Sequence, residues 1–347
     1  MTQSPHPAST QQRRSRLRSP FVWLLIATVA FIAAGCNAYP QNIFEPKSEF
    51  AQTLDDLFKL ILWAAAFVFV VVEGALVYAA IKHRARPGDP LPKQVHGNKY
   101  LEIAWTVLPA IVLGVILVPS TQAIFETQAP APADSLKVRV IGHQFWWEFE
   151  YLDLGVRTAN EIRMPIGRTL SLEETSADVI HSFWIPALGG KRDVVPGRTN
   201  FLWWTPRETG TFPGQCAELC GYSHANMRMR GIVQTQAEFD AWVEQQKAPA
   251  QVPPPNTDAA KGAELVQQRC ASCHAIGGTA AQARVGPDLT HLASRTTIAA
   301  GVLDNTPENL KRWISDPSAI KPGALMPKLG LTDDELNQVV AYLSQLQ

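Results

Sequence analysis

Residues 216–227, CAELCGYSHANM, gather metal-binding side chains in one short segment. They are the thiols of Cys216 and Cys220, the imidazole of His224 and the thioether of Met227. This soft set suits copper better than magnesium, calcium or manganese, and zinc gains little from a thioether. Two cysteines at this spacing can both bridge a pair of copper ions, which leaves His224 and Met227 as terminal ligands. A second histidine is then needed, and His181, in VIHSFW, is the best-placed candidate.

The alternative for Cys216 and Cys220 is a disulfide, the usual fate of a cysteine pair in an oxidising compartment. A disulfide explains neither Glu218 between the cysteines nor the Gly-x-x-His-x-x-Met that follows. These additional residues favour copper.

A second motif, Cys270-Ala-Ser-Cys273-His274, is typical of covalent attachment of a c-type haem, with two thioether bonds to the porphyrin and His274 on the iron. Half a zinc site and a redox-active cysteine pair are the alternatives. The zinc site needs further cysteines, and none remains in this segment. The redox pair needs a βαβ context, which the helical patterns here do not provide.

The sixth ligand of the haem iron can be sought by elimination. Beyond residue 230 the only methionine is Met326, and the only histidine besides His274 is His291. A methionine opposite a histidine raises the haem potential, as an electron acceptor in a respiratory chain requires. We therefore expect Met326 to be the axial ligand and His291 to be a surface or structural residue.

The motif Cys-x-Glu-x-Cys-Gly-x-x-His-x-x-Met, with Asp-Val-x-His-Ser-Phe upstream, resembles subunit 2 of the haem-copper cytochrome c oxidases. The resemblance runs from about residue 50 to 245. It implies a binuclear copper centre, copper A, that accepts electrons from cytochrome c and passes them to haem in subunit 1. It implies that the backbone carbonyl of Glu218 binds one copper and that its carboxylate faces a magnesium ion at the interface with subunit 1. The implied copper ligands are His181, Cys216, Glu218, Cys220, His224 and Met227.

Residues 257–347 resemble small bacterial cytochromes c. The shared features are the Met326-Pro context after a Pro-Gly turn and a Gly-Pro-x-Leu stretch, Gly286–Leu289, near the proximal histidine. An oxidase subunit 2 with a fused cytochrome c domain is of the kind known as the caa type.

The composition sets broad limits on function. The chain has 347 residues, enough for two or three domains, and its formal net charge of zero suggests no nucleic-acid or polyanionic partner. Four of its five cysteines belong to the two cofactor motifs.

The fifth, Cys36, ends a predicted export signal over residues 1–35. A basic head containing Arg13, Arg14, Arg16 and Arg18 precedes an apolar stretch, Phe21 to Ala34, that closes on Ala-Ala-Gly-Cys. This ending resembles a bacterial lipoprotein cleavage site, which would make Cys36 a lipidated N-terminus. The alternative is an uncleaved anchor with an unmodified thiol.

Two apolar runs, residues 57–81 and 103–124, are long enough to cross a bilayer and predict a transmembrane hairpin over residues 50–125. Positive charge marks the cytoplasmic side of a membrane. The connecting loop is positively charged, so we expect everything after residue 125 to lie on the outer face of a bacterial cell membrane. The charged residues of the loop are Lys82, Arg84, Arg86, Lys93 and Lys99.

Two acidic residues receive roles only from the resemblance. Glu102, at the cytoplasmic start of the second span, matches a glutamate at the mouth of a proton path into subunit 1. Asp193, in KRDVVPGR, lies in a family segment close to the interfacial magnesium. The alternative for Glu102 is an ordinary interfacial acid, and the alternative for Asp193 is a solvated turn.

The soluble part predicts two domains. Short runs at 137–141, 144–151, 168–172, 200–204 and 231–234 are typical of a β-sandwich, and a helix over 237–247 closes it. We expect a cupredoxin-like domain over 135–247, with the copper motif and His181 both on loops. A proline-rich linker, 248–256, leads to an all-α cytochrome c domain, 257–347, with helices near 258–269, 307–315 and 332–346.

The aromatic run 145–149 departs from the family at one position. A tryptophan that accepts electrons from soluble cytochrome c is common there, but this chain has Phe145. This departure fits a chain that carries its own haem, and we hypothesise that the fused haem reduces the copper within one molecule.

The sequence therefore predicts a multi-domain membrane protein that brings electrons into a proton-pumping oxidase, with subunits 1 and 3, the membrane and cytochrome c or another donor as partners. Oxygen reduction belongs to subunit 1. The alternatives are a copper A-type nitric oxide reductase and a membrane-anchored electron carrier. Quinol oxidase subunits lack the copper ligands, so the intact motif argues against them.

Overall fold

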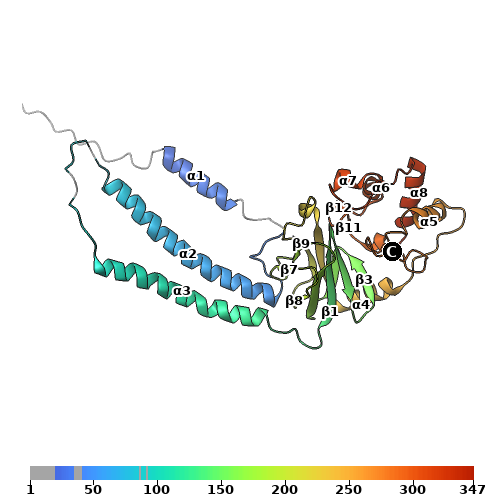
Figure 1. Cartoon of the computed structure of the whole chain (residues 1–347), viewed down its shortest axis with the longest axis horizontal. Helices are drawn as coiled ribbons and strands as arrows, with labels where there is room; N and C mark the ends of the chain where they lie inside the picture. The colour runs from blue at the N-terminus through green and yellow to red at the C-terminus, as the bar shows by residue number, and fades with distance from the viewer. Residues whose placement is uncertain (1–19, 35–40, 86, 91–92) are drawn as a thin grey trace, which may run out of the picture. The chain divides into compact units, whose positions relative to one another are not determined.

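The structure, a computed structural model, describes residues 20–34, 41–85, 87–90 and 93–347 (Figure 1). It divides into two units, 1–42 and 43–347. The first contains helix α1, Pro20–Ala34, which coincides with the apolar stretch of the predicted signal. The predicted lipidation site, Cys36, and the arginine-rich head lie outside the described residues.

The second unit begins with two long apolar helices that lie side by side, α2, Glu49–Lys82, and α3, Lys99–Thr127 (Figure 1). Both are long and apolar enough to span a membrane. Each starts at a side-chain cap, because Ser48 Oγ and Asn98 Oδ1 accept hydrogen bonds from backbone N–H groups of the first turn. Helix α2 begins eight residues before the predicted span 57–81 and ends one residue after it, and α3 extends the predicted span 103–124 by four and three residues.

The N-terminal end of α2 is fixed to the soluble domain. Its 34 residues correspond to about 50 Å of helix, longer than the roughly 30 Å hydrocarbon core of a bilayer. Ser48 Oγ donates to the Leu188 carbonyl at 2.5 Å, and the Phe50 ring packs 6.3 Å from that of Trp203. The hairpin and the soluble domain are therefore joined by packing as well as by the chain.

Residues 136–234 form two five-stranded sheets, with strand orders β3-β2-β1-β5-β8 and β4-β10-β9-β6-β7. Strands β1 and β5 alternate buried and less buried residues, so their inner faces contribute to the core. The Phe183 ring lies 5.4 Å from that of Trp147 and 6.0 Å from that of Trp204 in this core. The strands are β1 Leu136–His143, β2 Trp146–Tyr151, β3 Val156–Ala159, β4 Glu161–Pro165, β5 Leu170–Ser176, β6 His181–Trp184, β7 Arg192–Val194, β8 Asn200–Trp204, β9 Gly210–Cys216 and β10 Arg228–Gln234.

The five expected strands correspond to β1, β2, β5, β8 and β10, and the closing helix is α4, Gln236–Lys247. The expectation that His181 lies on a loop was wrong: His181 is the first residue of β6, and Cys216 is the last residue of β9. The five strands that were not expected have three to seven residues, and β9 contains Pro213 and Gly214, which weaken a strand pattern.

The C-terminal domain packs its first and last helices against each other. These are α5, Asp258–Arg269, and α8, Asp333–Leu343, and they cross so closely that a Cβ at Gly262 would lie 2.0 Å from the Gln338 carbonyl oxygen. Between them lie α6, Pro307–Ser315, α7, Pro317–Ile320, and the two-residue strands β11, Thr297–Ile298, and β12, Leu303–Asp304. The three expected helices are present as α5, α6 and α8, and the short helix α7 and the β11–β12 ladder were not expected.

Candidate metal and haem sites

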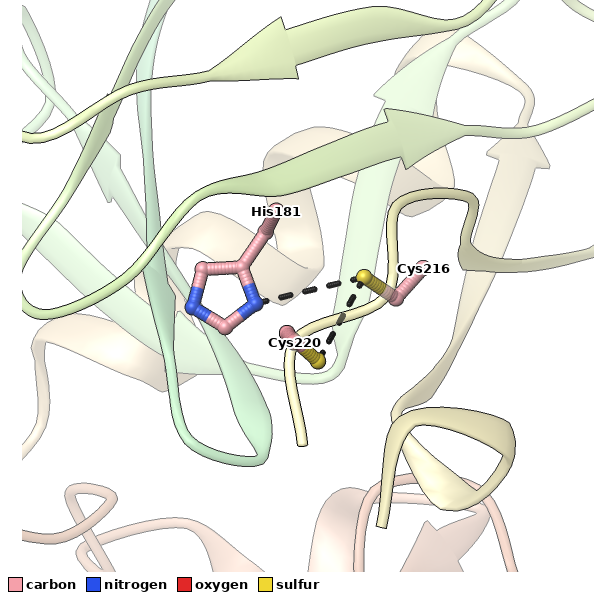
Figure 2. Close-up of side chains that lie close together, drawn as sticks. All are labelled: His181, Cys216 and Cys220. Atoms are coloured by element: carbon pink, nitrogen blue, oxygen red, sulfur yellow. Dashed lines mark hydrogen bonds between the residues drawn. The ribbon is translucent and has the colours of Figure 1, made fainter. Parts of the chain in front are cut away.

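His181, Cys216 and Cys220 converge in the sandwich interior (Figure 2). Their ligand atoms lie within 4.8 Å of one another, and all three residues are buried. Cys216 Sγ lies 3.8 Å from Cys220 Sγ and 3.9 Å from His181 Nδ1. A disulfide requires about 2.05 Å, so the cysteine pair is not bonded.

Three further donor atoms surround this cluster. His224 Nδ1 and Met227 Sδ lie 3.7 and 3.9 Å from Cys220 Sγ, and the Glu218 carbonyl oxygen lies 3.2 Å from Cys216 Sγ. Two atoms that each lie about 2.2 Å from one metal at a tetrahedral angle are about 3.6 Å apart. The donor set therefore fits around metal ions in both spacing and chemistry.

The backbone closes the segment that carries these donors. Cys216 N donates to the Met227 carbonyl at 2.9 Å, so the chain leaves and re-enters the sheet at the same point. Ala217 N donates to the Ser182 carbonyl, which ties the segment to β6 beside His181. The β9–β10 pairing continues directly into the loop, and two strands of one sheet thus hold the ligands in place.

The two thiols compete for protons. The hydrogen bond between the sulfurs lowers the pKa of Cys216 and raises the pKa of Cys220, because the one proton they share stabilises a thiolate on Cys216 and is retained by Cys220, and a second buried thiolate would be repelled by the first. Both become thiolates together only with a compensating positive charge nearby. Metal ions provide that charge, so binding is coupled to proton release.

Asp178 orients His181. Its Oδ1 lies 2.8 Å from His181 Nε2, so that nitrogen carries the proton and Nδ1 faces Cys216. Burial alone lowers the pKa of His181, but the hydrogen bond to Asp178 raises it overall. A carboxylate behind a ligating histidine fixes the tautomer and increases its basicity.

The haem-attachment motif follows directly from α5. Cys270 caps the helix, and His274 N donates to its carbonyl, so Cys270, Cys273 and His274 share one turn. His274 Nδ1 lies 2.7 Å from the Pro287 carbonyl oxygen and donates to it, which leaves Nε2 for a metal. Burial lowers the pKa of His274 and keeps the ring neutral, as ligation requires.

A cavity opens at this turn. A Cβ at Gly286 would lie 2.6 Å from His274 Cε1, so glycine is needed beside the ring. Arg295 lines the cavity with a buried Nε that has no hydrogen-bond partner among the described residues. Its walls also include Cys270, Cys273, His274 and Met326 of the C-terminal domain and Gln144, Phe145 and Asn160 of the sandwich.

Three sequence profiles match the chain: "Cytochrome C oxidase subunit II, transmembrane domain" over residues 37–123, "Cytochrome C oxidase subunit II, periplasmic domain" over 154–235 and "Cytochrome c" over 259–347. Cytochrome c oxidase subunit 2 of Alkalihalophilus pseudofirmus is 40% identical over 94% of this chain and 96% of the relative. The chain belongs to the cytochrome c oxidase subunit 2 family. The Bacillus subtilis subunit 2 is 36% identical over 93% of this chain and 97% of its own length.

Among solved structures, the periplasmic domain of subunit II of cytochrome oxidase from Bradyrhizobium japonicum is 35% identical. The match covers 34% of this chain and 97% of the Bradyrhizobium japonicum domain, with a TM-score of 0.33. For this chain, the family domains imply copper A and haem c, and they confirm the predicted fusion of a cytochrome c domain to an oxidase subunit.

Several predicted residues of this subunit 2 lie away from the two clusters. Asp193 is exposed on β7, and the Glu218 side chain is also exposed. Glu102 lies in the first turn of α3, where Oε1 accepts a hydrogen bond from Asn98 N at 3.2 Å. His291 is buried and structural: its ring nitrogens lie 2.7 and 3.1 Å from the carbonyl oxygens of Gln347 and Gln246.

Sequence reasoning missed three residues of the site. Asp178 has a signal, since Asp-x-x-His places a carboxylate near the imidazole, but no role was assigned to it. No signal in the sequence marks Gln144 or Arg295, because their contacts exist only in the folded chain. Gln144 Nε2 donates to the carbonyl of the distant Cys220 at 2.6 Å, and Arg295 donates to the Asp288 carbonyl.

Asp178→Asn tests the orienting carboxylate of this subunit 2. The amide keeps the size of the side chain but loses its charge, so we expect copper affinity to fall roughly 10- to 100-fold. Competition with a copper chelator, followed by visible absorption, measures this change. Asp153→Asn is the control, because Asp153 lies in the β2–β3 turn outside the site. Equal affinity in Asp178→Asn and wild type would exclude the orienting role.

Proposed function

We propose that this chain accepts electrons for a haem-copper oxidase, passing them from its own haem c through a binuclear copper centre to subunit 1. Subunit 1 would reduce oxygen to water and pump protons. The observation that carries the proposal is the convergence of His181, Cys216 and Cys220 in one buried cluster, with further donors around it.

The copper ligands follow from the atoms that face the cluster. Cys216 and Cys220 would supply the thiolates that hold two copper ions, and His181 Nδ1, 3.9 Å from Cys216 Sγ, and His224 Nδ1, 3.7 Å from Cys220 Sγ, would be the imidazole ligands. The Glu218 carbonyl and Met227 Sδ complete the set. Bound copper supplies a one-electron acceptor, and the paired strands hold its ligands still on a change of oxidation state.

The haem ligands follow in the same way. Cys270 and Cys273 supply the thioether bonds, and His274 supplies Nε2 because Pro287 occupies Nδ1. Met326 lines the same cavity and is assigned as the second axial ligand. The free Nε of Arg295 suits a haem propionate, which would satisfy that buried donor.

Phe145 supports a direct route between the two sites. It is 6% exposed and lines the haem cavity, and a Cβ at Gly221, next to Cys220, would lie 3.1 Å from its ring. Gln144 binds the Cys220 carbonyl. The usual family position for electrons from a soluble cytochrome is thus covered by the fused domain, which favours reduction of the copper by the haem of the same chain.

Subunit 1 is assigned to the side of His224 that faces α2. A hollow of about 640 Å³ lies there, bounded by the first turns of α2, by Gly189–Lys191 and by His224, and it offers room for a segment of a partner. We assign an interfacial magnesium ion to the exposed carboxylates of Glu218 and Asp193. Subunit 3 is assigned to the membrane part, and cytochrome c or another donor reduces the haem.

The basic residues between α2 and α3 favour a cytoplasmic loop, so the copper and haem domains would lie on the outer face of the membrane. Lipidation of Cys36 after signal cleavage would add an anchor there. Intact-mass measurement of the purified subunit tests this point: an unmodified Cys36 within an uncleaved N-terminus would contradict it.

Metal and haem analysis of the complex purified through this chain tests the proposed centres. We expect two copper ions per covalent haem in this subunit, with electron spin shared between equivalent coppers in the paramagnetic resonance spectrum. A zinc-filled or single-copper site would contradict the assignment.

Glu102 is proposed to lie at the mouth of the proton path into subunit 1. Glu102→Gln separates this role from helix capping, because the amide oxygen still accepts the Asn98 N–H but the amide cannot take up or release a proton. We expect proton uptake and turnover to slow by about 100-fold or more, as is typical for loss of a proton-transferring group. Thr106→Val, one turn along α3, is the control. Unchanged proton uptake in Glu102→Gln would leave Glu102 with only a capping role.

A further inference from the structure

The segment 296–301, here called the docking hairpin, has an unusual backbone. Ala299, Ala300 and Gly301 all have positive φ, at 53°, 59° and 73°. The left-handed conformation is unfavourable for alanine, by about 1–2 kcal/mol per residue. Two successive alanines in this conformation mean that surrounding contacts impose the shape of the hairpin.

The main contact comes from Glu161, at the start of β4 in the sandwich. Its Oε1 accepts four hydrogen bonds from the hairpin: from N and Oγ1 of Thr296 at 2.7 and 2.6 Å, and from N and Oγ1 of Thr297 at 2.9 and 3.2 Å. Glu161 is 2% exposed. A buried carboxylate is costly unless hydrogen-bonded, and here the donors come from the other domain.

The far end of the hairpin is tied to the copper site. The Ala300 carbonyl accepts from Arg228 N at 3.1 Å, one residue beyond the predicted copper ligand Met227. Lys321 Nζ donates to the Ala299 carbonyl at 3.4 Å and also to the Phe145 carbonyl. The hairpin is therefore held at both ends, once by Glu161 and once beside the copper loop.

The same hairpin forms a wall of the haem cavity through residues 297–300. Asn160, the neighbour of Glu161, lines the cavity from the sandwich side, and its positive φ of 61° turns the chain into β4. A displacement of the hairpin would thus move the cavity relative to Phe145 and Cys220. The linker alone keeps the two domains near each other but does not orient them.

We propose that Glu161 is a positioning residue for electron transfer from haem to copper. It binds the docking hairpin and thereby fixes the haem cavity against the copper loop. The inference rests on the proposed function, in which one electron leaves the ferrous haem and reduces the oxidised copper pair, with no bond made or broken and no proton moved.

The test is Glu161→Ala in the complete complex, with two readouts. The first is the rate of copper reduction after photoreduction of the haem, which we expect to fall about tenfold, because loss of the buried charge-assisted hydrogen bonds depopulates the docked arrangement. The second is hydrogen exchange at the Thr296 and Thr297 amides, expected to accelerate by about tenfold or more. Glu161→Gln, which retains an acceptor oxygen, should be intermediate in both.

Arg284→Ala is the matched control. Arg284 forms an exposed ion pair, 3.9 Å to Glu150, between the same two domains, and its loss should change either readout less than about twofold. Thr296→Val removes the Thr296 hydroxyl that donates to Glu161 and leaves the sandwich unchanged, so it tests the Glu161 contact from the C-terminal domain. It should shift both readouts in the direction of Glu161→Ala.

The outcomes separate the inference from the proposed function. If wild-type haem does not reduce the copper, the proposed function fails whatever Glu161 does. If wild type transfers the electron and Glu161→Ala does so at the same rate, with both centres present, the positioning role is overturned. A slower rate in Arg284→Ala equal to that in Glu161→Ala would overturn it too, because any weakening of the contact would then suffice.

Discussion

Cys216→Ser is expected to remove the copper centre and stop electron delivery, while the haem remains covalently attached and reducible. A serine hydroxyl is a hard and poorly ionised donor, so it cannot replace a bridging thiolate. We expect oxygen consumption by the complex to fall by more than about 100-fold, since mutation of residues that only orient metal ligands already lowers metal affinity or activity 10- to 100-fold. Visible and paramagnetic resonance spectra of the purified complex give the copper content.

Ser182→Ala is the matched control for this variant. Ser182 follows His181 and is buried, and its Oγ has no hydrogen-bond partner among the described residues. Removing that oxygen should leave copper content and turnover unchanged. Retention of the copper spectrum in Cys216→Ser would contradict the ligand assignment.

His274→Ala is expected to block electron delivery at the preceding step. The copper ligands are untouched, so the copper centre should form, but the haem loses its proximal ligand. The variant has lost the tethered donor and its high effective concentration, and the fused domain covers Phe145. We therefore expect external cytochrome c to reduce the copper of the variant more than about 100-fold more slowly than the haem reduces it in the wild type. Stopped-flow absorption at the copper band measures this rate.

His291→Ala is the control for the haem site. Both ring nitrogens of His291 bind backbone carbonyls, so its loss should cost about 1–3 kcal/mol of stability without altering the haem spectrum. Rapid reduction of copper by external cytochrome c in His274→Ala would contradict the intramolecular route.

The parts of the site that the sequence predicted are those in which ligands lie close together in the chain. Cys216, Cys220, His224 and Met227 share one loop, and Cys270, Cys273 and His274 share one turn, so local spacing already carries their geometry. His181 is 35 residues from Cys216, so spacing carries no geometry for it; the need for a second histidine and the family resemblance indicated its role.

Contacts between domains left no signal in the sequence. Glu161 and Thr296 are 135 residues apart, and neither a lone glutamate before a short strand nor a Thr-Thr pair is distinctive. The burial that makes Glu161 significant exists only once the two domains pack. The same reason explains the missed strands: β7, with three residues, is defined by its pairing with β6 rather than by its own composition.

Gas consumption by the complex purified from native membranes through this chain shows whether the chain delivers electrons to an oxygen-reducing, proton-pumping partner. Reduced cytochrome c would be supplied as donor, with oxygen and nitric oxide offered in separate experiments. We expect rapid oxygen uptake with proton release to the outer side. Consumption of nitric oxide without proton pumping, or of neither gas, would contradict the proposed function.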